Sequence, residues 1–322
     1  MAKTIVGILR GGTSSEYNLS LKTGAAMLSA LPEERYETRD ILIDKKGLWH
    51  LRGIPMSPAR ALAQVDVVLN GLHGGVGEDG TVARLLERTN IPYTGSAPLQ
   101  SGLALNKIRA RQILMQAGVH MPRAVWFSLK NKMTTADMAR IAFARFPPPY
   151  VVKPPLEGAS YGILYVPHLL DLPEVIGDML DRYGSVLVEE YINGREATVG
   201  IIEKFRRENL YALPPTRIIV PERARWIESS HHENAALHHF VPSDFSDQQK
   251  KILINMARQA HSVLGLRHFS RADFIVAPRQ IYLLEVNALP GLYSGAAFPE
   301  MLDSVGVSTG QFLEHAISLT RM

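Results

Sequence analysis

Short apolar runs alternate with glycine-containing loops and amphipathic segments along most of the chain. Residues 4–9 form a continuous apolar run, which is typical of a strand buried in a parallel sheet. A turn follows at 11–16, and Ser20 is a suitable cap for a helix that runs through Leu31. Further strands are expected at 38–43 and 65–70. This order predicts a small α/β layer whose loops lie where such sheets place ligands.

Two of these N-terminal loops carry candidate functional residues. Glu16 ends the first loop, where a carboxylate can face the crevice at the end of the strand. A solvated loop acid is the simpler alternative. The second loop, at 71–80, surrounds His73 and two acids with glycines. Glycine loses the most backbone entropy on ordering, so this loop is best explained by tight turns or by close approach to a ligand.

The central part of the chain carries basic residues at two candidate phosphate-binding positions. A helix expected at 103–117 carries three of them: Lys107, Arg109 and Arg111. They belong either to an exposed helical face or to a polyphosphate site. Lys153 ends an apolar strand and precedes a loop of small residues at 156–162 that includes Ser160. A hairpin of this kind can fold over a triphosphate, because it offers amide N–H donors and one fixed charge.

A further apolar strand at 186–192 is flanked by acids at its end. Glu189 and Glu196 could receive an adenine amino group and ribose hydroxyls, or they could mark an exposed strand end. Residues 203–242 are the least regular stretch and carry four histidines. A transition-metal site needs further ligands at defined spacing, so we favour a mobile loop that covers the substrate. Helices are expected at 246–264 and 309–319.

Two apolar runs near the C-terminal end flank a short polar turn at 277–280, and this pattern predicts a β-hairpin. Asp273, Glu285 and Asn287 can face one side of it, because side chains two apart on a strand share a face. Two carboxylates and an amide oxygen suit Mg²⁺, which takes its other ligands from phosphates and water. Arg271 can share that face. A hairpin with scattered solvated acids is the alternative.

Composition narrows the class of protein. A chain of 322 residues suits two or three domains, and 46% hydrophobic with 20% charged residues is ordinary for a soluble protein. The formal charge of +4, without a long run of Lys and Arg, gives no argument for nucleic acid. The absence of cysteine excludes disulfides, thiolate metal sites and cysteine nucleophiles. The N-terminal run is too short for a signal peptide, and no window approaches the roughly 20 apolar residues of a membrane span. We expect a cytoplasmic protein without membrane contact.

Taken in order, these motifs resemble the ATP-grasp superfamily, and more closely the D-alanine–D-alanine ligase family. The matching motifs extend over nearly the whole chain: residues 11–16, 72–74, 77–80, 92–96, 152–154, 157–158, 285–287 and 290–291. The resemblance implies an α/β (α+β) ATP-grasp fold of three domains with the nucleotide held between two sheets. The domains would be an N-terminal α/β substrate domain at 1–96, a central ATP-grasp subdomain at 97–193, and a C-terminal ATP-grasp and metal-binding domain at 194–322.

The resemblance also implies a chemistry. ATP would phosphorylate the carboxylate of one D-alanine, and the amine of a second would attack the acyl phosphate, giving D-alanyl-D-alanine for peptidoglycan precursors. By similarity, the nucleotide would be held by Lys107, Lys153, Ser160, Glu189, Ile192 and Glu196. Two Mg²⁺ ions, or Mn²⁺, would be bound by Asp273, Glu285 and Asn287. Arg271 and the Gly291 N–H would form the oxyanion hole. Glu16 would bind the ammonium of the first substrate, and His73 would lie beside it. Small-molecule substrates and a homodimer are expected from the same resemblance.

The sequence departs from the family pattern on the second-substrate side. Ala159 stands where the family's glycine loop has a serine that hydrogen-bonds. His231 and His232 fall near the usual Lys-Tyr pair of the mobile loop, so His232 is the candidate substrate residue there. Ala296 and Ala297 stand near the donors for the second carboxylate. These changes leave open a ligase with another second substrate, such as a D-hydroxy acid or another amino acid. A nucleotide-binding relative that does not ligate is the third reading, but the complete Lys–Asp–Glu–Asn–Arg set speaks against it.

Overall fold

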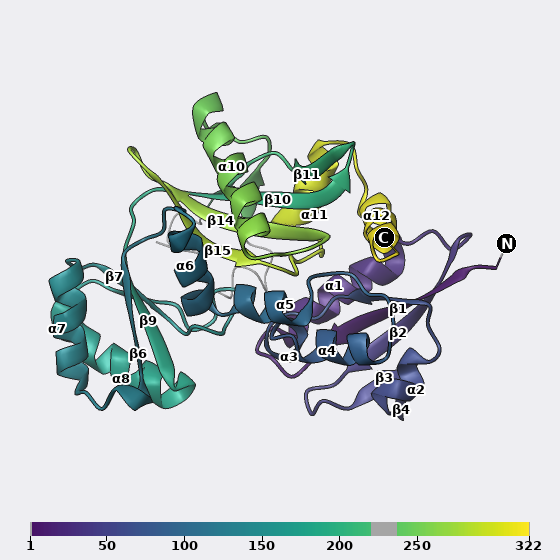
Figure 1. The fold of residues 1–322 in the computed structure, drawn as a ribbon, viewed down its shortest axis with the longest axis horizontal. Helices are drawn as coiled ribbons and strands as arrows, with labels where there is room; N and C mark the ends of the chain where they lie inside the picture. Colours follow the sequence, from purple (N-terminus) through teal and green to yellow (C-terminus); the bar gives the residue numbers. More distant parts are fainter. Residues whose placement is uncertain (1, 220–236, 322) are drawn as a thin grey trace.

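The computed structural model describes residues 2–219 and 237–321, and three β-sheets organise this part of the chain (Figure 1). One sheet is built from the N-terminal segment, one from the central segment and one from the C-terminal segment. Each lies within one of the three segments proposed as domains, so we keep the boundaries after 96 and 193 as a proposal. Among the described residues, no helix has the length and apolar character that crossing a membrane requires.

The N-terminal sheet has the strand order β4-β3-β2-β1-β5, with β1 parallel to both β2 and β5. Its strands are β1 (Thr4–Gly11), β2 (Tyr36–Ile43), β3 (Trp49–Leu51), β4 (Ile54–Met56) and β5 (Val67–Asn70). Its helices are α1 (Tyr17–Ala30), α2 (Pro58–Leu62), α3 (Gly75–Glu78) and α4 (Thr81–Arg88). The parallel pairing confirms the predicted α/β layer, and it brings the loops after β1 and β5 to the same edge.

Helix α1 begins earlier than the sequence predicts. Ser20 lies inside the helix, and its hydroxyl accepts from the Gly11 N–H and donates to the Gly71 carbonyl, both at 2.8 Å. The serine therefore ties α1 to the ends of β1 and β5 instead of capping the helix. Glu16 takes the N-cap position without a side-chain cap bond, which leaves its carboxylate for other partners.

The central sheet has the order β6-β9-β7-β8 and is antiparallel throughout. It comprises β6 (Ala124–Ser128), β7 (Tyr150–Lys153), β8 (Leu164–Val166) and β9 (Ser185–Glu190), and it packs on α7 (Thr135–Arg145) and α8 (Leu172–Tyr183). The strand predicted at 186–192 ends at Glu190, so Ile192 lies just beyond β9.

Two helices, rather than the single one predicted at 103–117, lead into this central unit. They are α5 (Pro98–Leu105) and α6 (Lys107–Gln116). Asn106 breaks the run because its backbone is extended (φ −79°, ψ 95°), and its side chain accepts from the Arg109 N–H at 3.1 Å. Lys107 is thereby the first residue of a freshly capped helix.

The C-terminal sheet is also antiparallel, with the path β13-β12-β10-β14-β15 and β11 beside β10. It comprises β10 (Arg195–Phe205), β11 (Glu208–Ala212), β12 (Thr216–Ile219), β13 (His238–Phe240), β14 (Phe269–Val276) and β15 (Ile281–Asn287). The helices of this segment are α10 (Asp247–Val263), α11 (Ala297–Ser304) and α12 (Thr309–Leu319). The last two strands form the predicted hairpin, in which Asp273 lies opposite Glu285 and Arg271 opposite Asn287.

The hydrophobic cores divide the molecule unevenly. One cluster joins β1 and β5 of the N-terminal sheet to α11 and α12, so the two ends of the chain share a core. Figure 1 shows α12 beside α1. The central unit has a cluster of its own, and its described members lie between Val125 and Val188. The N- and C-terminal segments are thus packed as one body, and the central unit adjoins it.

Candidate active site

Two cavities meet where the three sheets approach one another. The larger, about 450 Å³, is lined by the central and C-terminal sheets, and the smaller, about 50 Å³, lies against the N-terminal loops. Their linings share four residues: Ala159, Arg271, Glu285 and Tyr293. The larger volume is that of an ordinary cofactor pocket, whereas the smaller holds only a few water-sized groups. A large molecule in one cavity and a small molecule in the other could therefore contact each other at this shared wall.

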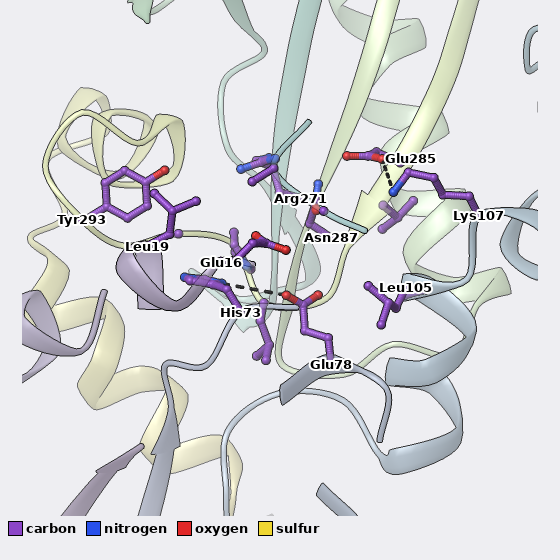
Figure 2. A pocket seen from close by; sticks show the side chains of 17 residues that line it. Glu16, Leu19, His73, Glu78, Leu105, Lys107, Arg271, Glu285, Asn287 and Tyr293 are labelled. Atoms are coloured by element: carbon purple, nitrogen blue, oxygen red, sulfur yellow. Dashed lines mark ion pairs between the residues drawn. The ribbon is translucent and has the colours of Figure 1, made fainter. Parts of the chain in front are cut away.

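Glu16 points into the small cavity from the start of α1 (Figure 2). It is 6% exposed, and two glycines approach it closely. A Cβ on Gly158 would overlap with Oε1 of Glu16, and a Cβ on Gly74 would lie 2.6 Å from the same atom. The two loops can therefore close on this carboxylate only because both positions lack a side chain.

A second buried acid, Glu78, lies in the same cavity. Burial raises the pKa of Glu16 to about 8, and the charge of Glu78 adds to the shift. Burial likewise raises the pKa of Glu78 to about 7, although its Oε1 accepts the Gly74 N–H at 2.8 Å. Sequence reasoning named Glu78 only as part of a motif, since nothing in the pattern shows that it is buried beside Glu16.

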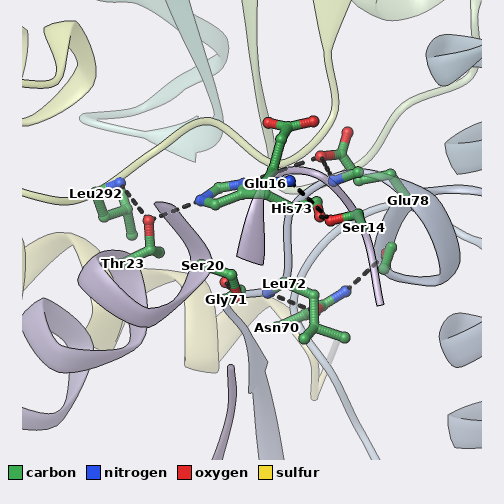
Figure 3. Close-up of polar contacts among 12 residues, drawn as sticks. Ser14, Glu16, Ser20, Thr23, Asn70, Gly71, Leu72, His73, Glu78 and Leu292 are labelled. Carbon is green, nitrogen blue, oxygen red and sulfur yellow. Dashed lines mark hydrogen bonds and ion pairs between the residues drawn. The ribbon is translucent and has the colours of Figure 1, made fainter. Parts of the chain in front are cut away.

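His73 lies beside Glu16, as predicted (Figure 3). Burial lowers its pKa to about 4, and the charge of Arg271 acts in the same direction. Its Nδ1 is 3.9 Å from Glu78, but a neutral imidazole makes no ion pair there. Nε2 lies 2.7 Å from the Thr23 hydroxyl, which also accepts the Leu292 N–H at 3.4 Å. Through Thr23, His73 therefore links the loop at 71–80 to the loop that carries Gly291.

The C-terminal hairpin carries a polar network at the shared wall. Arg271 donates to both oxygens of Asp273, from Nε at 2.9 Å and Nη2 at 2.7 Å. Asp273 also accepts from the Asn287 amide at 2.8 Å and from the Thr198 hydroxyl at 2.7 Å. Thr198, on β10, is absent from the sequence predictions because its contact depends on the β10–β14 pairing.

Glu285 belongs to a neighbouring charge pair. Its Oε2 is 3.0 Å from Nζ of Lys107 (Figure 2). Burial opposes its ionisation, but the charges of Lys107 and Lys153 outweigh burial and lower the pKa of Glu285 to about 2. The Lys107 ammonium also donates to the Glu157 carbonyl at 2.5 Å. Lys107 therefore lines the small cavity beside Glu285, and not the larger cavity.

The donor set of the hairpin fits a hard metal ion only with help from other ligands. Among the described residues, no group of three His, Cys, Asp or Glu side chains is arranged to hold a metal. Asp273 and Glu285 supply two carboxylates, and the third predicted ligand is an amide, Asn287. Its nitrogen faces Asp273, so the ligand would be its oxygen. This set suits Mg²⁺ completed by phosphate oxygens and water.

The larger cavity holds most of the predicted nucleotide-binding residues. Its lining includes Lys153, Ser160, Glu189, Ile192 and Glu196. Lys153, at the end of β7, contacts Oε2 of Glu189 at 2.5 Å, and both side chains are almost fully buried. The structure thus brings together side chains from β7, β9 and β10. Their individual roles stay predictions.

Two further residues belong to the site. Arg111 is buried against Glu189, at 2.9 Å from Oε1, so neither sequence interpretation of it, exposed face or phosphate ligand, was right. Tyr293 lies in the shared wall and packs with Leu19 and Ala296, and Ala159 packs against this cluster. Only its position after the motif at 290–291 could have indicated it. His232 lies outside the described residues, so its predicted role is untested.

Comparisons with known proteins agree over nearly the whole chain. Family models described as D-ala D-ala ligase N-terminus and C-terminus match residues 52–96 and 113–318. The D-alanine–D-alanine ligase of Sinorhizobium fredii is 34% identical over 96% of this chain and 95% of its own, and that of Carboxydothermus hydrogenoformans is 31% identical over 98% and 97%.

Solved structures give the same answer for the fold. D-alanyl-alanine synthetase A from Vibrio cholerae superposes with a TM-score of 0.87 at 25% identity, covering 99% of both chains. The VanG D-Ala:D-Ser ligase from Enterococcus faecalis gives 0.84 at 25% identity, covering 99% of this chain and 100% of that one. With the family models and the relatives in agreement, the chain belongs to the D-alanine–D-alanine ligase family and has its ATP-grasp fold.

Proposed function

We propose that the protein is an ATP-dependent ligase that joins two D-alanine molecules through an acyl phosphate, for peptidoglycan precursors. One observation carries the proposal. A nucleotide-sized cavity and a small cavity with a buried acid share a wall that contains Arg271 and Glu285. The family relatives named D-alanine–D-alanine ligase support the choice of substrate.

The small cavity would bind the first D-alanine. Its ammonium would pair with Glu16, and its carboxylate would point to the shared wall. A carboxylate oxygen would attack the γ-phosphorus of ATP, and the bond from that phosphorus to the β–γ bridging oxygen would break. Arg271 and the Gly291 N–H would stabilise the negative oxygen that develops when the second amine attacks the acyl carbon. That amine loses a proton, and phosphate leaves.

The larger cavity would bind ATP. Lys153 and Ser160 would hold phosphates, Lys107 would reach them from the small cavity, and Glu189, Ile192 and Glu196 would face the adenosine. Asp273, Glu285 and Asn287 would hold Mg²⁺, or Mn²⁺, together with phosphate oxygens. Such ions offset phosphate charge during transfer.

A second candidate function differs in the second substrate. Ala159 packs with Leu19, Tyr293 and Ala296 in an apolar cluster beside the shared wall. Neither Ala159 nor Ala296 has a side-chain hydrogen-bonding group, so these two positions give no polar contact that would select D-alanine as the second substrate. A D-hydroxy acid or another amino acid is therefore the alternative nucleophile.

One experiment tests both candidates. The protein is incubated with ATP, Mg²⁺ and D-alanine, alone and with a mixture of amino and hydroxy acids, and products are identified by mass spectrometry alongside phosphate release. We expect D-alanyl-D-alanine as the main product and a marked loss of phosphate release in Glu16→Gln. A product that joins D-alanine to another molecule would favour the alternative. ATP hydrolysis without any ligated product would overturn both.

The family resemblance also leads us to propose a homodimer that acts on small molecules. Light scattering on the purified protein measures its mass directly. A mass of about one chain at micromolar concentration would contradict the dimer.

A further inference from the structure

A buried charge cluster lies behind the larger cavity. Glu189 accepts from two cations, Arg111 at 2.9 Å on Oε1 and Lys153 at 2.5 Å on Oε2. The three side chains are 3%, 4% and 6% exposed for Arg111, Glu189 and Lys153. Glu189 and Lys153 line the cavity, but Arg111 does not. The cluster carries two positive charges and one negative charge, so its net charge is +1.

The guanidinium makes fewer hydrogen bonds than its burial demands. Among the described residues, Nη2 of Arg111 is a buried donor without a hydrogen-bond partner. The contact with Oε1 of Glu189 uses a single N–H donor, whereas arginine brings a second buried amino group that it leaves unpaired. The position therefore uses the charge of arginine, and not only its hydrogen bond.

The same helix face carries a second cation toward a second sheet. Lys107 and Arg111 are one turn apart on α6, so they lie on one face. Lys107 contacts Glu285 on β15 of the C-terminal sheet, whereas Arg111 contacts Glu189 on β9 of the central sheet. These two sheets line the larger cavity. Helix α6 therefore ties together carboxylates from both walls.

We propose that Arg111 is a positioning residue for nucleotide binding: by occupying one oxygen of Glu189, it keeps the Lys153 ammonium available to a phosphate. With Arg111 in place, Glu189 is shared between two cations and the cluster stays positive. Without that charge, Glu189 and Lys153 form a neutral pair, and the carboxylate holds the ammonium alone. Charges in a buried site act strongly because the dielectric constant there is low. This inference rests on the proposed ATP-binding function.

Binding measurements separate a role in charge from a role in structure. Calorimetry gives the Kd of adenosine, ADP and ATP for the wild type, Arg111→Gln and Arg111→Lys. Glutamine loses the charge and carries an N–H donor on a shorter side chain, whereas lysine keeps the charge on a side chain of nearly the length of arginine. We expect Arg111→Gln to weaken ATP roughly tenfold and adenosine by less than about twofold, with ADP between them, because the charge acts on phosphates. Arg111→Lys should bind ATP nearly as the wild type does.

Arg109→Gln is the matched control, because Arg109 is an exposed arginine on the same helix, and its Kd values should not change. Equal weakening of adenosine and ATP in Arg111→Gln, or no weakening, would overturn the inference. If Arg111→Gln does not fold, a tenfold loss of ATP affinity in folded Arg111→Lys would overturn it, and wild-type affinity would support it. If the wild-type protein binds no ATP, that result would instead contradict the proposed function.

Discussion

Among the acids that the structure describes, Glu16 has the pKa that its surroundings raise furthest. It is buried beside Glu78, and burial raises its pKa to about 8. The folded protein keeps this proton up to about pH 8, whereas the unfolded chain releases it near pH 4.5. The folded state therefore binds more protons between these values, and the ligand-free protein loses stability as the pH rises through them.

Replacing Glu16 by a neutral residue should remove this loss of stability at high pH. We expect Glu16→Gln to be more stable than the wild type at pH 8, by about 1–3 kcal/mol, and to match it near pH 4.5. Urea unfolding at both pH values measures the difference. Glu33→Gln, at an exposed acid, should change nothing. An equal gain at both pH values would contradict the protonation argument.

The glycine that faces Glu16 supports a second prediction at this scale. A methyl group on Gly158 would overlap with Oε1 of Glu16, so either the loop or the carboxylate must move. We expect Gly158→Ala to raise the KM for D-alanine about tenfold, since small displacements at a binding group are costly. Steady-state kinetics with saturating ATP measure it.

Gly177→Ala provides the comparison for that variant. Gly177 lies in α8, where the nearest atom to a new Cβ is 3.8 Å away. This change should leave the KM unchanged and stabilise the protein by about 0.4–1 kcal/mol. An unchanged KM in Gly158→Ala would show that the loop is free to move away from Glu16.

Among the elements, α6 is notable because its first residue, Lys107, lines the small cavity. Asn106 caps it and makes Lys107 its first residue. We expect Asn106→Ala to cost about 1 kcal/mol of stability and to raise the KM for ATP about threefold or more, because the Lys107 ammonium is then less well fixed. Thermal unfolding and kinetics measure the two effects.

Ser246→Ala is the control for the loss of a cap. Ser246 caps α10 through a capping box with Gln249, and neither residue lines a cavity of the site. This variant should lose similar stability without any change in KM. A rise in KM in both variants would mean that stability, and not the position of Lys107, sets the affinity for ATP.

The elements also show which parts of the structure could be read from the sequence. The C-terminal hairpin was predictable because its apolar runs flank a polar turn and its acids are two apart. The break between α5 and α6 was missed, since apolar periodicity continues across Asn106 and only its cap contact marks it. Ser20 was misassigned because a serine near a helix start is usually a cap, whereas here it bonds two strand ends.

Contacts between elements that are distant along the chain could not be predicted from the sequence. The sequence shows Arg111 only as a basic residue of a helix. Its burial and its ion pair with Glu189 depend on the position of the central sheet relative to α6. The family resemblance supplied the site residues, and the structure brings most of them to two adjoining cavities. The burial of Glu78 and the contact of Thr198 with Asp273 needed the assembled sheets.

At the scale of the whole molecule, the arrangement of the hydrophobic cores predicts two parts that unfold locally with different free energies. The first and last parts of the chain share one hydrophobic cluster, and the central unit has its own. We expect amides of β7 and β9 to exchange with a lower opening free energy than those of β1 and β14, because the central unit can open alone.

Native-state hydrogen exchange at increasing denaturant measures these opening energies. ATP should raise protection in β7 and β9 more than in β1, since both sheets beside the larger cavity would then hold the ligand. A single opening energy for all three sheets would contradict the division.

The proton on Glu16 would make its proposed pairing with the D-alanine ammonium measurable as a heat of binding. An ammonium group that enters the small cavity finds this carboxyl protonated near neutral pH, because burial raises its pKa to about 8. To form the pair, the carboxyl must pass its proton to the solvent, where the buffer takes it up with its own heat of ionisation. The enthalpy of D-alanine binding at pH 7 should therefore change linearly with the ionisation enthalpy of the buffer, with a slope whose sign shows a net release of protons. The slope should fall toward zero above pH 9, where the free enzyme has already lost the proton.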